Sequence, residues 1–258
     1  MNRQWPLLLA LAVAAACRSA APVLTPEAQP TPAPSPAAAA QPPSPAPAPV
    51  HIPEGIRWVR DSAEHRALFL QVYREATAHV EREAARHAPG TWAVVLDADE
   101  TVIDNSLYEV ERIEGILPFN APAWHEWTTR RAAVPLPGAA AFLVRVRALG
   151  GRIAIITNRT ESECPDTEAV FRTHELPFDV MLCKPDAGPR DKNPRFEAVA
   201  RGTTPAGLPP LEVVAFVGDN IFDFPGLSQA IVKQGDEAFA EFGVRFFVLP
   251  NPMYGSWN

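Results

Sequence analysis

The chain has 258 residues, of which 47% are hydrophobic and 21% charged, an ordinary globular composition apart from its 29 prolines. The formal net charge of -7 argues against a nucleic-acid polymer or an anionic membrane surface as the main partner. The three cysteines form no CxxC pair and the six histidines have no HExxH or HxH spacing, so the sequence contains no recognisable zinc motif.

The first 16 residues have the pattern of a signal peptide. A short segment with Arg3 is followed by an apolar run that ends in three alanines, and the run is too short to span a bilayer. Cys17 directly after these alanines resembles a bacterial lipobox, which predicts lipidation of Cys17 and attachment to a membrane. The alternative is an ordinary secretory signal whose cleavage removes Cys17. Both interpretations predict export, to the outer membrane or the periplasm.

Residues 17–53 follow as a tether. Twelve prolines lie between positions 22 and 53, and Arg18 and Glu27 are the only charged residues between positions 18 and 53. Such a segment cannot bury a core, so we expect a semi-rigid polyproline linker. The remaining residues, 54–258, are numerous enough for one well-buried domain.

The pattern of the domain predicts helices alternating with strands. A helix is expected over residues 61–87, capped by Asp61 or Ser62, and another over residues 138–149. The apolar face of the first consists of Leu68, Val72, Tyr73, Ala76 and Val80. Strands are expected over residues 92–97, 152–157, 212–219 and 245–249, where the runs are short, apolar and rich in β-branched residues. Continuous apolar strands separated by helices predict an open, mostly parallel, Rossmann-like α/β sheet.

Polar residues follow three of these strands. Asp97 and Asp99 come at the end of the first strand, Thr157 and Asn158 at the end of the second, and Asp219 at the end of the third, with Asp223 four residues further on. Two of the chain's three lysines, Lys184 and Lys192, lie between the second and third strands. Because ligands bind at the carboxyl ends of parallel strands, we expect these residues to form one site.

This set of residues suits phosphoryl transfer. Such a site needs a carboxylate-held Mg²⁺, a cation, and neutral hydroxyl and amide donors for the phosphate oxygens. One aspartate would act as the nucleophile and form an aspartyl-phosphate, and a second carboxylate would protonate the leaving alkoxide and then activate water. Asp97 and Asp99 are correctly offset for these two roles.

The motifs also resemble those of a known family. Residues 97–101 (DADET), Thr157-Asn158, Lys192 and residues 218–223 (GDNIFD) are similar to the four-motif signature of the haloacid-dehalogenase superfamily. More narrowly, the sequence resembles the class C nonspecific acid phosphatases, bacterial surface lipoproteins with 5'-nucleotidase activity. The narrower resemblance covers residues 56–258 and rests on further pieces, among them Asp104-Asn105-Ser106, Trp124, Trp127, Pro250-Asn251 and Tyr254-Gly255.

The resemblance implies a haloacid-dehalogenase-like fold with a small helical and aromatic cap, and it assigns roles by position. Asp97 would be the nucleophile and a Mg²⁺ ligand, and Asp99 the acid/base, whose backbone carbonyl also binds the metal. Asp219 would be a further metal ligand and Asp223 a supporting acidic position. Thr157, Asn158 and Lys192 would bind phosphate, with Lys184 as the competing lysine.

Three questions stay open at this stage. Trp124 and Tyr254 are interpreted either as a clamp for a substrate base or as packing in the cap or core. Cys164 and Cys183 form a disulfide or remain free thiols, and the oligomeric state is undetermined. The sequence predicts a Mg²⁺-dependent phosphatase for small phosphomonoesters, nucleoside 5'-monophosphates in particular. The alternative is a non-catalytic binding lipoprotein with the same fold.

Overall fold

The computed structural model describes residues 50–257, and the predicted signal peptide, Cys17 and most of the tether lie outside this range. Two helices, α1 (Glu54–Asp61) and α2 (Ala63–Ala84), precede the first strand. Ser62, one of the two caps that the sequence predicts, caps α2 by accepting a hydrogen bond from the backbone nitrogen of His65 (3.1 Å). The predicted apolar face is wrong at one position, because Leu68 is exposed and Phe69 is buried instead. Within the described range no helix has the length and apolar character of a membrane span.

A five-stranded parallel sheet forms the centre of the domain, in the order β5-β4-β1-β6-β7. Its strands are β1 (Trp92–Leu96), β4 (Arg152–Thr160), β5 (Val180–Lys184), β6 (Glu212–Gly218) and β7 (Phe246–Val248). The predicted open α/β architecture is therefore confirmed. Strand β5 was not predicted, and β4 extends three residues beyond its predicted end.

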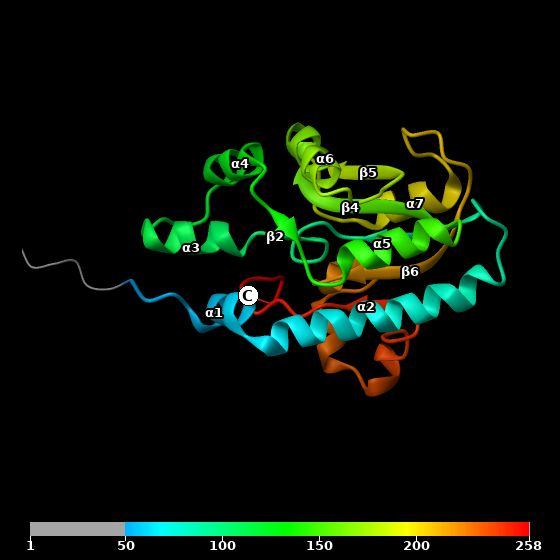
Figure 1. Cartoon of the computed structure of the whole chain (residues 1–258), viewed down its shortest axis with the longest axis horizontal. Helices are drawn as coiled ribbons and strands as arrows, with labels where there is room; N and C mark the ends of the chain where they lie inside the picture. Colours follow the sequence, from blue (N-terminus) through cyan, green and yellow to red (C-terminus); the bar gives the residue numbers. More distant parts are fainter. Residues whose placement is uncertain (1–49, 258) are drawn as a thin grey trace, which may run out of the picture. The chain divides into compact units, whose positions relative to one another are not determined.

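Helices cover both faces of this sheet. Side chains alternate along a strand, so Trp92, Val94 and Leu96 of β1 face one hydrophobic cluster while Ala93 and Val95 face the other. The first cluster includes residues of α2, α5 (Ala139–Ala148) and α6 (Cys164–Thr173), and the second those of α7 (Asn193–Arg201). Figure 1 shows α2 and α5 running along the sheet on the first face.

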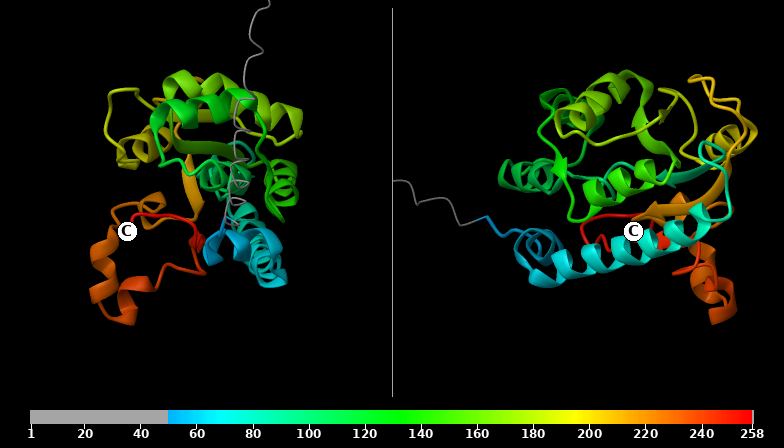
Figure 2. Two further views of the ribbon diagram at one scale, coloured as in Figure 1. Left: turned by 90° about the vertical axis from the view of Figure 1, so that its left-hand side faces the viewer. Right: turned by 45° about the vertical axis from the view of Figure 1, so that its right-hand side comes forward.

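A small insertion follows β1 and forms a cap. Strand β2 (Ile103–Asp104) pairs with β3 (Val134–Pro135) in an antiparallel two-stranded sheet. Helices α3 (Ser106–Glu114) and α4 (Ala121–Arg130) lie between these two strands in the sequence. Figure 1 shows α3 and α4 beyond the ends of the strands. Residues 50–257 also form four short 3-10 helices, η1 (Glu161–Glu163), η2 (Ile221–Asp223), η3 (Gln229–Lys233) and η4 (Asp236–Phe239). In both views of Figure 2 the segment between β6 and β7, drawn in orange, lies apart from the cap.

The strand order identifies where a ligand should bind. The chain runs outward from β1 through β4 to β5, then returns to β6 on the opposite side of β1. The order therefore reverses between β1 and β6, and ligands of open α/β sheets bind at such switch points, outside the carboxyl ends of the strands. Asp97 and Asp219 directly follow these two strands.

Candidate active site

Three carboxylates meet at this switch point. Each of Asp97, Asp219 and Asp223 offers an oxygen that lies within 4.8 Å of the others' oxygens, close enough to bind one metal ion together. Asp97 and Asp223 are buried and Asp219 is partly exposed. Carboxylate oxygens are the ligands that Mg²⁺ and Ca²⁺ prefer, so the donors fit a hard divalent cation.

The β6–η2 turn brings Asp223 into this cluster. The backbone nitrogen of Asn220 donates to the Oδ2 atom of Asp223 (2.9 Å), which fixes that side chain against the turn. Gly218 permits the approach, because a Cβ atom at this position would lie only 2.3 Å from the Cβ atom of Asp223. Any other residue at position 218 would displace the carboxylate.

Lys192 provides the cation of the cluster. Its Nζ atom donates to the Oδ1 atom of Asp97 (2.5 Å) and to the Oδ1 atom of Asp223 (2.6 Å), and its side chain is only 3% exposed. Lys184, the competing lysine, instead donates to the backbone oxygens of Pro185 and Asp186. The structure thus places Lys192, and not Lys184, beside the carboxylates.

Burial and mutual repulsion raise the pKa values of two carboxyl groups in the cluster. Burial raises the pKa of Asp97 to about 7, the Lys192 ammonium opposes this rise, and the carboxylates of Asp223 and Asp99 add to it. The pKa of Asp219 is raised well above its usual value by burial and by Asp223 and Asp97. Although burial disfavours its charge, the adjoining carboxylates raise the pKa of Lys192, which is therefore an ammonium at neutral pH. A divalent cation would relieve the repulsion.

The predicted phosphate donors lie within β4 and not after it, contrary to the sequence prediction. Pairing of β4 with β5 is irregular between Ile156 and Thr160, and Thr157 and Asn158 occupy this interval. The backbone carbonyl of Thr157 and the Oδ1 atom of Asn158 both accept hydrogen bonds from Arg195, the latter at 2.7 Å. Arg195 therefore holds this segment in place beside the carboxyl end of β1.

The carboxylate of Asp99 makes a separate set of contacts. Its Oδ1 atom accepts hydrogen bonds from Asn105 Nδ2 (2.8 Å) and from Arg159 Nε (2.9 Å). Asn105 is fully buried and also accepts from Trp127 Nε1 (2.9 Å), which connects the cap to the loop after β1. The assignment of the Asp99 backbone carbonyl as a metal ligand stays a prediction.

Several neighbours of the site were not predicted from the sequence. The buried carboxylate of Glu100 accepts from the backbone nitrogen of Asn105 (2.8 Å), and Asn251 Nδ2 donates to Asp219 Oδ2 (2.8 Å). Arg159 lies two residues after Thr157. Asn105 and Asn251 belong to the segments on which the family resemblance rests, and that was the available signal for them.

The two predicted aromatic residues lie in different parts of the domain. Trp124, in α4, packs against Tyr108 (ring centroids 5.2 Å apart) and Phe119 (6.3 Å) in the cap. Tyr254 is partly buried in the C-terminal segment, which also carries Asn251. Among the aromatic contacts of the described residues, none joins Trp124 to Tyr254.

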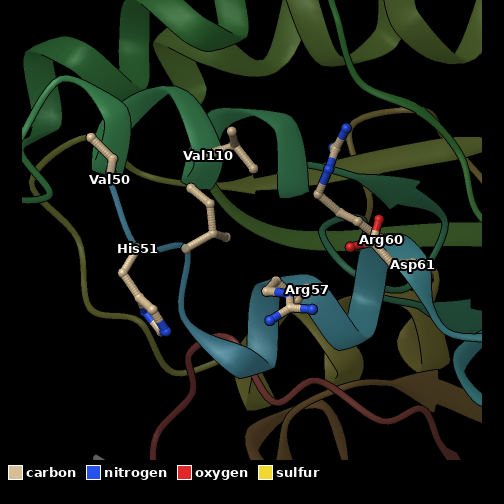
Figure 3. A pocket seen from close by; sticks show the side chains of 7 residues that line it. Val50, His51, Arg57, Arg60, Asp61 and Val110 are labelled. Atoms are coloured by element: carbon tan, nitrogen blue, oxygen red, sulfur yellow. The ribbon is translucent and has the colours of Figure 1, made fainter. Parts of the chain in front are cut away.

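A cavity of about 410 Å³ lies elsewhere, beside α1 and α3 (Figure 3). Its lining includes none of the residues described above; it consists of Val50, His51, Ile52, Arg57, Arg60, Asp61 and Val110. Figure 3 shows that Arg60 and His51 extend in different directions and do not converge on a common point. The carboxylate cluster, and not this cavity, therefore defines the candidate active site.

Two cysteines form a disulfide between α6 and β5. Cys164, the first residue of α6, is bonded to Cys183 of β5. The pairing that the sequence left open is therefore formed. It connects the segment after β4 to the neighbouring strand.

Comparison with known proteins agrees with this geometry. A family model described as HAD superfamily, subfamily IIIB (acid phosphatase), matches residues 45–257. The chain belongs to this family. The fold and the family predicted from the motifs are both confirmed.

Two solved structures show the same relationship. A class C acid phosphatase from Bacillus anthracis has 28% sequence identity to this chain and a TM-score of 0.69, over 79% of this chain and 84% of that one. A structure of the class C acid phosphatase from the same organism with tungstate bound has 27% identity and a TM-score of 0.68, over the same shares. This acid phosphatase is therefore a phosphomonoesterase, as predicted, and not a non-catalytic binding protein.

Proposed function

We propose that this acid phosphatase hydrolyses nucleoside 5'-monophosphates with the help of Mg²⁺ and through an aspartyl-phosphate intermediate. The observation that carries the proposal is the cluster of Asp97, Asp219 and Asp223 around the Lys192 ammonium. These oxygen donors fit Mg²⁺, which would neutralise charge on the phosphoryl oxygens when bound. The tungstate bound to the Bacillus anthracis relative is a tetrahedral oxyanion and supports a phosphate site in this fold.

The residues divide the reaction into two displacements. In the first, an Asp97 carboxylate oxygen forms a bond to phosphorus while the ester P–O bond breaks, and Asp99 gives its proton to the departing alkoxide. In the second, Asp99 accepts a proton from water as the water oxygen attacks phosphorus, which releases orthophosphate and regenerates the Asp97 carboxylate. Lys192, Thr157 and Asn158 would bind the phosphoryl oxygens throughout.

The preference for nucleotides rests on the aromatic residues. Trp124 and Tyr254 would hold the base of a nucleoside monophosphate, and stacking on an aromatic side chain contributes about 1 to 3 kcal/mol per base. Trp124 lies in the cap, beyond the carboxyl ends of the strands, where a group attached to the phosphate would extend. Tyr254 belongs to the segment whose Asn251 bonds to Asp219.

The place of action is part of the proposal. A signal peptide over residues 1–16, lipidation of Cys17 and a tether over residues 17–53 would present the domain of residues 54–258 outside the cytoplasm, in the periplasm or at the outer membrane. The disulfide between Cys164 and Cys183 supports export, because such bonds persist in oxidising compartments.

One experiment tests the catalytic proposal. Phosphate release is measured from AMP, 4-nitrophenyl phosphate and ethyl phosphate, with Mg²⁺ and with a chelator, for the wild type and for Asp97→Asn. An amide cannot form the acyl phosphate and is a weaker ligand, so we expect Asp97→Asn to lose turnover and chelation to abolish it. Asp236→Asn, at an exposed position of η4, is the matched control. Near-wild-type activity of Asp97→Asn would refute the proposed nucleophile.

A further inference from the structure

A buried arginine binds both oxygens of the Asp99 carboxylate. Arg159 Nε donates to Oδ1 (2.9 Å) and to Oδ2 (3.2 Å), and Nη2 lies 2.8 Å from Oδ1. The Arg159 side chain is 1% exposed. Such a planar, charge-assisted contact restricts the orientation of a carboxylate more than a single point charge does.

The other two nitrogens of this guanidinium also donate hydrogen bonds. Nη2 donates to the Oδ1 atom of Asn105 (2.9 Å) and Nη1 to the hydroxyl of Thr167 in α6 (3.2 Å). The guanidinium carbon lies 5.3 Å from the ring centroid of Trp124, within the range of a cation–π contact. Contacts to the loop after β1, to α6 and to the cap therefore hold Arg159 in one position.

These contacts make the two oxygens of Asp99 unequal. Oδ1 accepts hydrogen bonds from Arg159 Nε (2.9 Å) and Asn105 Nδ2 (2.8 Å) and lies within ion-pair distance of Arg159 Nη2, whereas Oδ2 accepts only the longer bond from Nε (3.2 Å). An oxygen whose two lone pairs both accept short hydrogen bonds has no lone pair left to hold a proton of its own. Oδ2 is thus the oxygen that can carry a proton to a leaving group.

We propose that Arg159 is a positioning residue that, with Asn105, fixes the Asp99 carboxylate so that Oδ2 exchanges the proton with the leaving group. This inference rests on the proposed acid/base role of Asp99. General acid catalysis requires the proton within hydrogen-bond reach of the leaving oxygen, so a carboxylate free to rotate transfers it less efficiently. Within the described residues, the Arg159 guanidinium makes no hydrogen bond to the Asp97, Asp219 or Asp223 carboxylates.

The test compares two substrates that differ only in the leaving group. Phenyl phosphate and 4-nitrophenyl phosphate have similar aromatic rings, but nitrophenolate departs without a proton and phenolate benefits from one. For Arg159→Met we expect kcat/KM to fall on the order of 10²-fold with phenyl phosphate and less than tenfold with 4-nitrophenyl phosphate. Arg159→Lys retains the positive charge but loses the planar contact with both carboxylate oxygens. We therefore expect its kcat/KM, too, to fall more with phenyl phosphate than with 4-nitrophenyl phosphate.

The controls separate this inference from the proposed function. Arg145→Met removes an exposed arginine of α5 that pairs with Glu81, and it should change neither rate. Equal losses on both phosphates in folded Arg159→Met and Arg159→Lys, or no loss, would overturn the inference. If Asp99→Asn loses more kcat/KM with phenyl phosphate than with 4-nitrophenyl phosphate and the Arg159 variants do not, Asp99 keeps its acid/base role and the positioning role of Arg159 is wrong. If Asp99→Asn loses equally with both substrates, the acid/base role of Asp99 is itself wrong. If Arg159→Met does not fold, Arg159→Lys decides.

Discussion

Removing the disulfide should lower the stability of the domain without stopping catalysis. Cys164 and Cys183 are 19 positions apart, and the bond joins α6 to β5. In the loop-entropy description, a cross-link over a loop of this length stabilises the folded state by about 3 kcal/mol, because it restricts the unfolded chain. For a domain of about 200 residues, 1 kcal/mol corresponds to a shift of about 2 to 4 °C in Tm. The double variant Cys164→Ala/Cys183→Ala should therefore melt about 6 to 12 °C lower.

The measurement is thermal unfolding followed by circular dichroism, with and without reductant, for the wild type and the double variant. Reductant should lower the Tm of the wild type to that of the variant and leave the variant unchanged. Phosphate release at 25 °C should stay within about twofold, because neither cysteine contacts the carboxylates of the site. Equal melting temperatures for oxidised wild type and variant would show that the bond does not contribute as reasoned.

Three further predictions concern the metal, the base and the anchor. Because the pKa of Asp97 is raised to about 7 in the metal-free protein, metal binding must release a proton at lower pH. The apparent Mg²⁺ affinity should then fall at least tenfold per pH unit below about 7, because the pKa of Asp219 is raised as well, and a pH-independent affinity by calorimetry would contradict this. Trp124→Ala should raise KM for AMP by about 5- to 150-fold and leave ethyl phosphate nearly unaffected, whereas equal weakening would assign Trp124 to cap packing. Cys17→Ser should release the mature protein from the detergent phase. A native N-terminus downstream of residue 17, found by mass spectrometry, would refute the predicted anchor.

The strands show why the fold could largely be predicted. β1, β4 and β6 are buried on both faces, and their continuous apolar sequences are distinct from the flanking helices. β5 lies at the edge of the sheet and has five residues, of which Met181 and Lys184 are partly exposed. Its apolar pattern is therefore too short and too mixed to identify a strand. The helix prediction failed at Leu68 for a similar reason, because Phe69 next to it fits the same helical period.

The site was predictable where the backbone alone determines position. Asp97 and Asp219 follow adjacent parallel strands, so their proximity is a consequence of topology. Arg159 contacts Asp99 across 60 positions of sequence, and Asn251 contacts Asp219 across 32. Which polar partner such a side chain contacts depends on the packing of the cap and of the C-terminal segment. Strand periodicity carries no information about that packing.

In the proposed mechanism, the charges of the cluster would require a cation to bind before the substrate. If ionised, the carboxylates of Asp97, Asp219 and Asp223 carry three negative charges, and Lys192 supplies one positive charge among them. A phosphomonoester dianion entering this site would meet a net charge of about -2, and each pair of like unit charges 4 Å apart costs about 4 kcal/mol at an effective dielectric constant of 20. In the proposed mechanism a divalent cation would cancel that charge, after which Lys192, Thr157 and Asn158 would act as donors to the phosphoryl oxygens. The proposed metal would therefore serve substrate binding as well as chemistry.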